Sequence, residues 1–434
     1  MDLLLNETAK VGTWGAFIGL AVAIILIILK LHPAYSLIIG AVVGGLTGLA
    51  GLDGTFNYIF LGAKDMIKPI LRILTSGILA GALIKTGSAE KIATSIIKLF
   101  GNKLALIAIA ISSMIICAVG VFIDITVITI APIAIIVARK SGIPRSAILI
   151  AMIGGGKAGN IISPNPNTQS TAEAYNIPMM DLIARNIVPA LCALLVTILI
   201  AYLLFKRKKD YIKEENEEEH DQFSRKKEVI QLPNIFAALA GPVVVIVLLI
   251  ISAFVEQVTI DPLIALPIGG LTTILVTGKI KEVIDITSFG LNKVSGIVIL
   301  LLGTGALAGI ISNSNLGSDI EKLINLMNMP AWLLAPISGF FMAAAAASTT
   351  AGASLASTTF SKTIIAGGVS ATSAAAMTHA SATILDSLPH GSFFHATGGS
   401  VAMNFKDRLK LIPFEALIGL TSTIGSIVVY CIFK

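Results

Sequence analysis

Long apolar segments separated by short polar ones occupy almost the whole chain. A helix that spans a bilayer needs about 20 apolar residues, and segments near that length recur in both halves. The candidates are 14–31, 35–52, 66–85, 104–119, 121–138, 146–163 and 182–205, then 234–254, 262–277, 288–311, 331–347, 350–367, 370–388 and 411–433. The pattern predicts an all-α polytopic membrane protein with about 12–14 membrane segments, some of them broken helices or re-entrant hairpins.

One strongly charged segment divides this pattern in two. It begins FKRKKDYIKEENEEEHDQFSRKKE and has no apolar face to bury. We therefore predict a first membrane repeat over 1–204, a linker over 205–232 and a second membrane repeat over 233–434. Basic residues concentrate in the loops on the linker's side, so the positive-inside rule predicts a cytoplasmic linker with both termini outside. Each half then has an odd number of spans, which inverts the second relative to the first.

Two polar stretches interrupt the apolar pattern, one near the end of each half. GNIISPNPNTQSTAEAYNIPMMDLIARNIVP runs from Gly159 to Pro189, and ATILDSLPHGSFFHATGGSVAMNFKDRLKLIP runs from Ala382 to Pro413. Each joins two apolar helices through a proline-containing polar turn. Paired broken helices at matching positions of two inverted halves indicate the binding site of a secondary transporter. Transport is therefore the leading hypothesis.

Shorter matches between the halves support a repeat. SGILAG begins at Ser76 and TGALAG at Thr304, and each precedes an amphipathic segment, 87–101 in one half and 317–327 in the other. Their charged and apolar residues alternate at helical spacing, which is typical of helices in the membrane interface. These matches and the two polar stretches all lie about 225 residues apart, as an inverted repeat predicts.

Composition places the chain in a bilayer. Hydrophobic residues make up 55% and charged residues 13%, whereas charged residues form about 25% of soluble proteins. The net charge of +6 arises in short loops beside apolar segments, so it does not indicate nucleic acid. The N-terminus has no basic start or cleavage site of a signal peptide, and the first apolar segment is expected to be a membrane helix.

Asp124 is the first candidate for ion coupling. It lies in ICAVGVFIDITVITIAPIAII, where the nearby residues are apolar or hydroxylated. A carboxylate at that depth costs at least about 2.5 kcal/mol unless something compensates for it, so it points to function. The alternative is an Asp that caps a helix after Gly120, with Thr126 and Thr129 bonding locally.

Amide and hydroxyl side chains provide candidate substrate ligands. They gather in the first polar stretch and in AAAASTTAGASLASTTFSK, and packing between helices or a surface loop is the alternative role. The glycines of GGGK before the first stretch are expected to permit close backbone approach and an unwound turn, and Lys157 suits an anion. The candidates are Asn160, Ser163, Asn165, Asn167, Thr168, Thr349, Thr350, Ser354, Ser357 and Thr358.

Four of the few ionisable groups in and just before the second polar stretch are His379, Asp386, His390 and His395. Their spacing does not suit zinc, and the three cysteines are isolated in apolar runs. Imidazole titrates near neutrality, so proton handling fits better. We assign Asp386 to ion coupling, His390 to a proton partner and His395 to substrate contact.

These motifs give the chain its family resemblance. LDSLPHG at 385–391 resembles the Leu-Asp-Thr-Leu-Pro-His-Asn segment of hydroxybutyrate-type members of the gluconate permease family. The segment 121–126, with Ala131-Pro132 after it, is similar to the family's Phe-Phe-Glu-Val segment followed by Leu-Pro, which puts Asp124 where the family has Glu. SPNPNT at 163–168 falls where gluconate permeases carry Pro-Pro-His-Pro-Gly-Pro. The resemblance covers most of the chain by spacing and these motifs by residue.

The resemblance implies a proton-coupled symporter of gluconate, 3-hydroxybutyrate or a related hydroxy acid. The wider ion-transporter superfamily implies a homodimer, in which each protomer has a scaffold and a mobile transport domain that moves like an elevator. The departures, Asp for Glu and a missing His, bear on the substrate and the coupling ion.

The sequence thus predicts a multi-pass inner-membrane carrier that couples a small organic anion to a cation, a proton rather than sodium. No phosphate-cradling loop, nucleotide fingerprint or catalytic set occurs, so no cofactor, metal, nucleic acid or enzyme activity is expected. A passive anion channel, a sodium-coupled carrier of a different carboxylate and a membrane-embedded enzyme are the alternatives. Inverted repeats also predict that Asn165 and His390 lie close together at mid-depth and line one anion site.

Overall fold

The computed structural model describes residues 11–29, 31–101, 104–207, 232–254, 260–316, 319, 330–389 and 391–433. Most of the predicted linker, most of the second amphipathic segment and His390 lie outside these residues. Every regular element in the described part is a helix, and an isolated bridge joins Val11 to Ser314. The predicted all-α fold is therefore confirmed.

The helices follow the apolar pattern closely. The first half contains α1 Thr13–Ile28, α2 Pro33–Thr47, α3 Gly51–Asp65, α4 Ile67–Lys85, α5 Ser88–Phe100, α6 Ala105–Ala118, α7 Ile123–Ser141, α8 Arg145–Asn160, α9 Pro166–Ala174 and α10 Met179–Lys206. The second contains α12 Ile235–Phe254, α13 Pro262–Val276, α14 Val283–Ser312, α16 Leu334–Ala346, α17 Thr349–Ala366, α18 Ala371–Ser381, α19 Ser392–Ser400, α20 Phe405–Leu409 and α21 Ile412–Ile432, with 3-10 turns at Ile280–Glu282 and Ala331–Leu333.

Several of these helices are long enough to cross a bilayer. By length and apolar composition, four in the described part qualify, namely Met179–Lys206, Ile235–Ser252, Ile280–Ser312 and Phe405–Ile432. The bent pair Gly51–Asp65 and Ile70–Lys85 would make a fifth, and further apolar helices are shorter. Many large apolar side chains on these helices are exposed, including Trp14 at 79% and Leu195 at 67%. Such surfaces suit lipid, and the chain is a multi-pass membrane protein.

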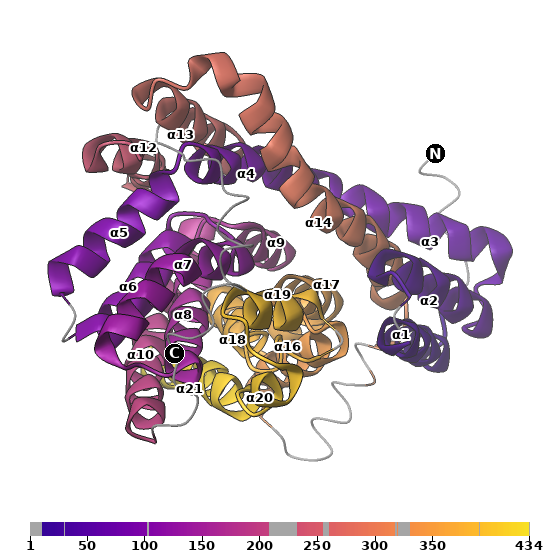
Figure 1. Cartoon of the computed structure of the whole chain (residues 1–434). Coiled ribbons are helices and arrows are strands. Elements are labelled where there is room, and N and C mark those ends of the chain that lie inside the picture. The colour runs from indigo at the N-terminus through magenta and orange to yellow at the C-terminus, as the bar shows by residue number, and fades with distance from the viewer. Residues whose placement is uncertain are drawn as a thin grey trace.

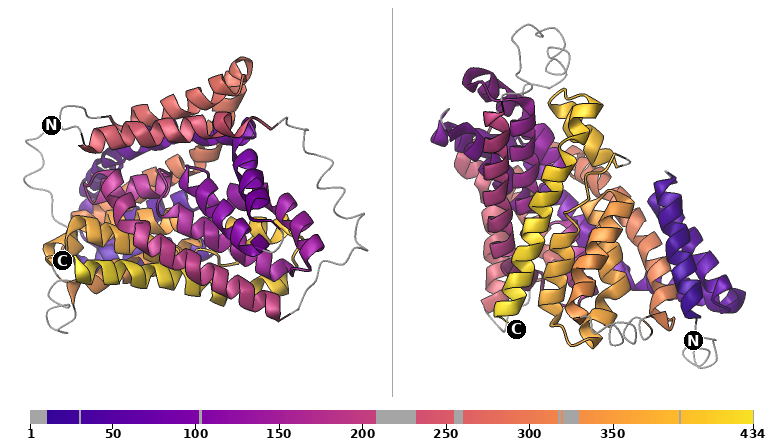
Figure 2. Two further views of the ribbon diagram at one scale, coloured as in Figure 1. Left: turned by 90° about the vertical axis from the view of Figure 1, so that its left-hand side faces the viewer. Right: turned by 90° about the horizontal axis from the view of Figure 1, so that it is seen from below.

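The helices form two groups (Figures 1 and 2). The peripheral group comprises α1–α4 and α12–α14, in which α14 packs along α4, α3 and α2. The central group comprises α6–α10 and α16–α21, in which α10 packs against α8 and α21. Contacts of α14 with α17 and of α4 with α9 join the groups. The amphipathic α5 packs between them, against α6 and α12.

Glycines allow the closest helix contacts. A Cβ on Gly15 of α1 would lie 2.2 Å from Gly48 at the end of α2, so these two helices meet backbone to backbone. In the central group, a Cβ on Gly159 of α8 would lie 2.2 Å from the carbonyl oxygen of Met114 on α6. The predicted close approach near GGGK is thus found. The predicted unwound turn is not, because α8 continues through Gly154, Gly155 and Gly156 as far as Asn160.

The sequence-based prediction missed one helix and placed the ends of two others too late. Helix α3 was not predicted, because glycines and charged residues interrupt the apolar residues of its sequence GLDGTFNYIFLGAKD. The apolar candidates 146–163 and 370–388 end early, at Asn160 and Ser381. Beyond both points the chain is irregular, and this irregular backbone forms the candidate site.

Candidate functional site

Both polar stretches are broken helices. Helix α8 ends at Asn160 and α9 restarts at Pro166, which takes the N1 position that proline favours because it has no N–H to lose. In the second half α18 ends at Ser381 and α19 restarts at Ser392. Each break separates two short helices of the central group. The predicted pair of broken helices is therefore present.

Two helical hairpins accompany the breaks. Helices α6 and α7 are joined by a turn in which Gly120 has a φ of 109°, and α16 and α17 by a turn in which Ala347 has a φ of 45°. Left-handed values favour glycine, and Ala347 tolerates one at the helix end. Each half of the central group thus has the order hairpin, broken helix and long helix. The hairpin turns place Asp124 and Thr349 in the first turns of α7 and α17.

Hairpin turns and broken helices from both halves meet at a single cavity of about 350 Å³. Its polar lining combines residues far apart in sequence, and α14 contributes one wall through Lys293, Gly296, Ile297 and Leu300. The polar lining residues are Asp124, Asn160, Asn167, Lys293, Ser348, Thr349, Thr350, Asp386 and Ser392.

An asparagine cluster holds the first break in shape. Asn165 is the N-cap of α9, and its Oδ1 accepts from the backbone N–H of Asn167 at 2.9 Å and of Thr168 at 3.1 Å. Its Nδ2 donates to Oδ1 of Asn160 at 2.7 Å. Asn167 Nδ2 donates to the same oxygen at 3.0 Å, while its own Oδ1 accepts from Thr350 of α17 at 2.5 Å. Asn165 therefore supports the backbone, whereas Asn160 and Asn167 line the cavity.

Asn160 keeps one unused donor. Its side chain is 2% exposed, and its Nδ2 has no partner in the described part of the chain. A buried amide N–H without an acceptor costs about 1–3 kcal/mol. Nδ2 itself is enclosed by protein, whereas Asn160 as a residue belongs to the lining of the cavity.

A buried ion pair joins the two halves at the wall of the cavity. Lys157 Nζ lies 2.7 Å from Oδ1 of Asp386, and both residues are 2% exposed. Lys157 also donates to the carbonyl oxygen of Thr383 at 2.6 Å. Asp386 Oδ2 accepts from Thr349 at 2.6 Å, and its Oδ1 accepts from Ser387 at 2.8 Å. The charge of Lys157 is thus committed to Asp386 and is not free for an anion.

Asp124 differs from Asp386 in its position and in its partners. The N-cap of α7 is Phe122, which makes no side-chain cap hydrogen bond, and Asp124 stands in the first helical turn. It is therefore not the N-cap of the alternative interpretation, although the helix N-terminus favours a carboxylate there. None of the salt bridges found in the described part of the chain involves Asp124. Its carboxylate faces the cavity together with Lys293.

The other predicted residues lie outside the cavity wall. Ser163 and Ser357 are buried, and their hydroxyls have no partner among the described residues. Thr168 donates to Asn165, Ser354 bonds Ser170 across α17 and α9 at 2.7 Å, and Thr358 donates to its own helix. His395 is exposed and bonds the carbonyl oxygen of Pro389 at 2.8 Å. The expected proximity of Asn165 and His390 involves a residue outside the described part.

Sequence reasoning missed Lys293. It lies within the apolar candidate 288–311, so the rule that selected Asp124, an ionisable group inside a span, also applied to it. No cluster of three or more His, Cys, Asp or Glu able to hold a metal occurs in the described part of the chain.

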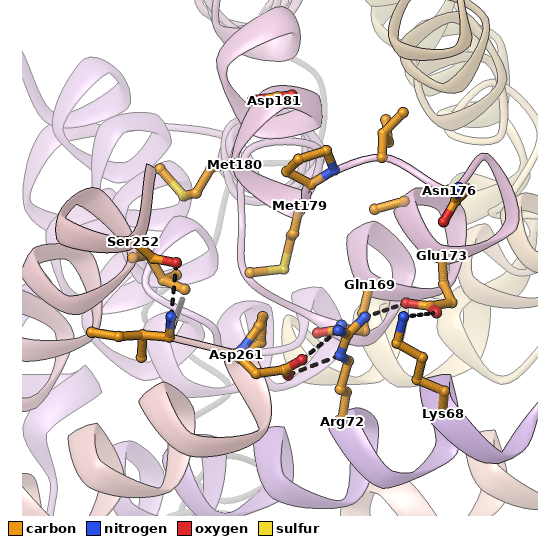
Figure 3. Close-up of a pocket in the computed structure, with 16 residues that line it drawn as sticks. Lys68, Arg72, Gln169, Glu173, Asn176, Met179, Met180, Asp181, Ser252 and Asp261 are labelled. Atoms are coloured by element: carbon orange, nitrogen blue, oxygen red, sulfur yellow. Dashed lines mark hydrogen bonds and ion pairs between the residues drawn. The ribbon is translucent and has the colours of Figure 1, made fainter. Parts of the chain in front are cut away.

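A second ionic cluster lies where the two groups of helices meet (Figure 3). Arg72 of α4 donates to both carboxylate oxygens of Asp261, the N-cap of α13, at 2.9 and 2.5 Å. The same guanidinium pairs with Glu173 of α9, and Lys68 lies 3.0 Å from that carboxylate. These residues line a larger pocket of about 600 Å³. Because its cations already hold carboxylates, it is the weaker candidate for an anion site.

Known proteins are similar to this chain in sequence and in fold. The model of the GntP family permeases matches residues 14–433. A protein of Haemophilus influenzae named as an uncharacterized transporter is 45% identical, over 97% of this chain and 98% of its own length. The Gnt-II system L-idonate transporter of Escherichia coli is 22% identical, over 70% of this chain and 73% of its own length.

Among solved structures, the Alcanivorax borkumensis YdaH transporter superposes with a TM-score of 0.63 at 13% identity, over 95% of this chain and 98% of that one. At this identity the likeness concerns the fold alone. The family match covers nearly the full chain, and the relatives are permeases and transporters, not enzymes. The chain belongs to the GntP family of permeases.

Proposed function

We propose that this permease is a cation-coupled symporter of a small organic anion, a hydroxycarboxylate such as gluconate or 3-hydroxybutyrate. The observation that carries the proposal is the cavity at which both broken helices and both hairpin turns meet. Irregular backbone is tolerated at membrane depth only where it is buried in protein or lines a cavity. A substrate site accounts for such backbone in both halves.

The chemistry of the cavity supports a hydroxy acid. Thr350, Ser348 and Asn160 line the cavity and carry hydrogen-bonding groups suited to hydroxyl and carboxylate oxygens. A volume of about 350 Å³ lies at the small end of ligand pockets, which span roughly 300–1,000 Å³. The relative named as an L-idonate transporter supports a sugar acid or a similar anion.

Asp124 is the coupling group in this proposal. It is the cavity carboxylate without a salt bridge, whereas Asp386 is already neutralised by Lys157. A proton on Asp124 would remove a negative charge that opposes the anion. We favour a proton over sodium because one proton is enough to neutralise a single carboxylate that has no salt bridge, whereas a hard cation is held by several oxygen ligands.

The helix groups support an elevator-like movement. We assign the peripheral group to a scaffold and the central group to the transport domain that carries the cavity. The equal order of hairpin, broken helix and long helix supports inverted repeats over 1–204 and 233–434. A homodimer in the inner membrane, with a cytoplasmic linker at 205–232, completes the proposal.

Uptake into proteoliposomes tests this function. Labelled hydroxy acids would be supplied with an imposed proton gradient, an imposed sodium gradient or no gradient. We expect accumulation of at least one anion above equilibrium in the proton gradient alone. Equilibration without accumulation would favour a passive channel, and accumulation with sodium alone would favour a sodium-coupled carrier.

A further inference from the structure

We propose that Lys293, on the peripheral helix α14, binds the carboxylate of the transported anion and links anion binding to the charge state of Asp124. This inference rests on the proposed function and adds a substrate residue from outside the central group.

Lys293 faces the cavity from an apolar helix. It lies in LNKVSGIVILLLG of α14, and it lines the cavity together with Asp124, Asn160 and Thr350. A cation within an apolar span is costly and is retained where it faces a partner or water. Its ammonium lies 5.2 Å from the ring centroid of Phe289, a contact that holds the side chain beside the helix but does not neutralise it.

The other cations near the contact between the two helix groups already form ion pairs. Lys157 pairs with Asp386, which lines the cavity, and Arg72 pairs with Asp261 and Glu173 in a separate pocket. None of the salt bridges within 4.0 Å in the described part of the chain involves Lys293. Among the described residues that line the cavity, Lys293 is thus the cation without an ion pair, and its charge is available to bind a carboxylate.

The positions of Lys293 and Asp124 also link anion binding to proton binding. With Asp124 ionised, Lys293 faces a carboxylate across the same cavity, and an anion that enters competes with that carboxylate and is repelled by it. A proton on Asp124 removes both effects, so anion and proton each favour the other's binding, as linkage requires. Because Lys293 belongs to the peripheral group, the anion must leave it when the central group moves. The contact therefore acts in only one of the end states.

Binding measurements on purified protein in lipid discs test this inference. The probe is the radiolabelled anion that the wild type accumulates most strongly, titrated between pH 5.5 and 8.5. We expect Lys293→Gln to weaken binding at least 10-fold, while Lys293→Arg stays within about 3-fold of the wild type because the charge is kept. Lys85→Gln is the matched control, since Lys85 also lies over Phe289, at 5.0 Å, but does not line the cavity.

The pH dependence separates a substrate contact from a packing role. The wild type should bind the anion more weakly as pH rises, and Asp124→Asn should bind it with the same affinity throughout. A second variant, Lys293→Cys, allows the positive charge to be restored chemically. Modification of this cysteine with a 2-aminoethyl thiosulfonate reagent adds an ammonium group and should recover binding. Modification with a negatively charged sulfonatoethyl reagent should not.

Unchanged affinity in Lys293→Gln, or equal recovery with both reagents, would overturn the inference. If Lys293→Gln does not fold, the comparison of the two modified forms of Lys293→Cys decides the question. A wild type that accumulates no anion in any gradient contradicts the proposed function itself, and this result is obtained before any variant is made.

Discussion

At the scale of residues, neighbouring polar side chains in the broken helices have different roles. Asn165 uses its side chain to cap α9 and to hold Asn160, whereas Asn160 lines the cavity and keeps a buried donor that has no partner among the described residues. Lys157 and Asp386 satisfy each other, whereas Asp124 and Lys293 face the cavity without short ion pairs. Residue type alone does not distinguish these roles, because they depend on partners that lie far away in sequence.

Asp124→Asn should keep the fold and abolish concentrative uptake. The amide preserves the shape of the side chain and removes the titratable charge on which coupling depends. Uptake driven by an imposed gradient and the thermal unfolding midpoint in detergent would be measured together. A variant that accumulates substrate at wild-type rates would make Asp124 a residue that only stabilises the start of α7.

The buried pair of Lys157 and Asp386 gives a prediction of stability. Lys157→Met leaves an uncompensated buried carboxylate and should destabilise the protein by about 3–5 kcal/mol. Adding Asp386→Asn should restore part of that loss, since no buried charge then remains unpaired. The control is Lys279→Met, which breaks an exposed pair with Glu282 and should cost less than about 1 kcal/mol. Simple addition of the two single effects in the double variant would contradict a direct pair.

At the scale of elements, periodicity and proline account for what could be predicted. The apolar segments predicted most helices within a few residues, and the polar stretches predicted both breaks, because polar residues interrupt the apolar pattern there. Helix α3 escaped prediction because its stability depends on packing against α14 and α2 and not on its own composition. The site was predicted in outline, but Lys157 was assigned to an anion because its partner is 229 residues away (386 − 157).

The cap of α9 can be tested independently of transport. Asn165→Ala should destabilise the protein by about 0.5–2 kcal/mol relative to Asn165→Ser, because serine retains the capping oxygen. Thermal unfolding of both variants in the same detergent measures the difference. Equal midpoints would mean that the cap contributes nothing and that Asn165 is available for another role.

At the scale of the whole molecule, an ionic cluster joins the parts that we propose to move. Arg72 is fixed by Asp261 within the peripheral group and reaches Glu173 in the central group (Figure 3). Movement of one group past the other must break this contact. The cluster therefore favours the conformation described here over the alternative.

Glu173→Gln should shift the equilibrium toward conformations in which the groups separate. Gln169 is 2% exposed beside this cluster, so a single cysteine at 169, with Cys117, Cys192 and Cys431 replaced, reports the opening. If the contact is worth about 1–2 kcal/mol, alkylation should accelerate roughly 5- to 30-fold. Glu282→Gln, which breaks a surface pair, should leave the rate unchanged, and an unchanged rate in Glu173→Gln would show that the cluster does not restrain the groups.

The position of the bound anion tests the proposed site most directly. A structure of the protein in lipid discs would be determined with the anion identified by uptake, at a concentration well above its Kd. We predict density in the 350 Å³ cavity, within hydrogen-bond distance of Thr350 and facing Lys293. Density beside Arg72 in the larger pocket, with the cavity filled by water alone, would contradict the site proposed here.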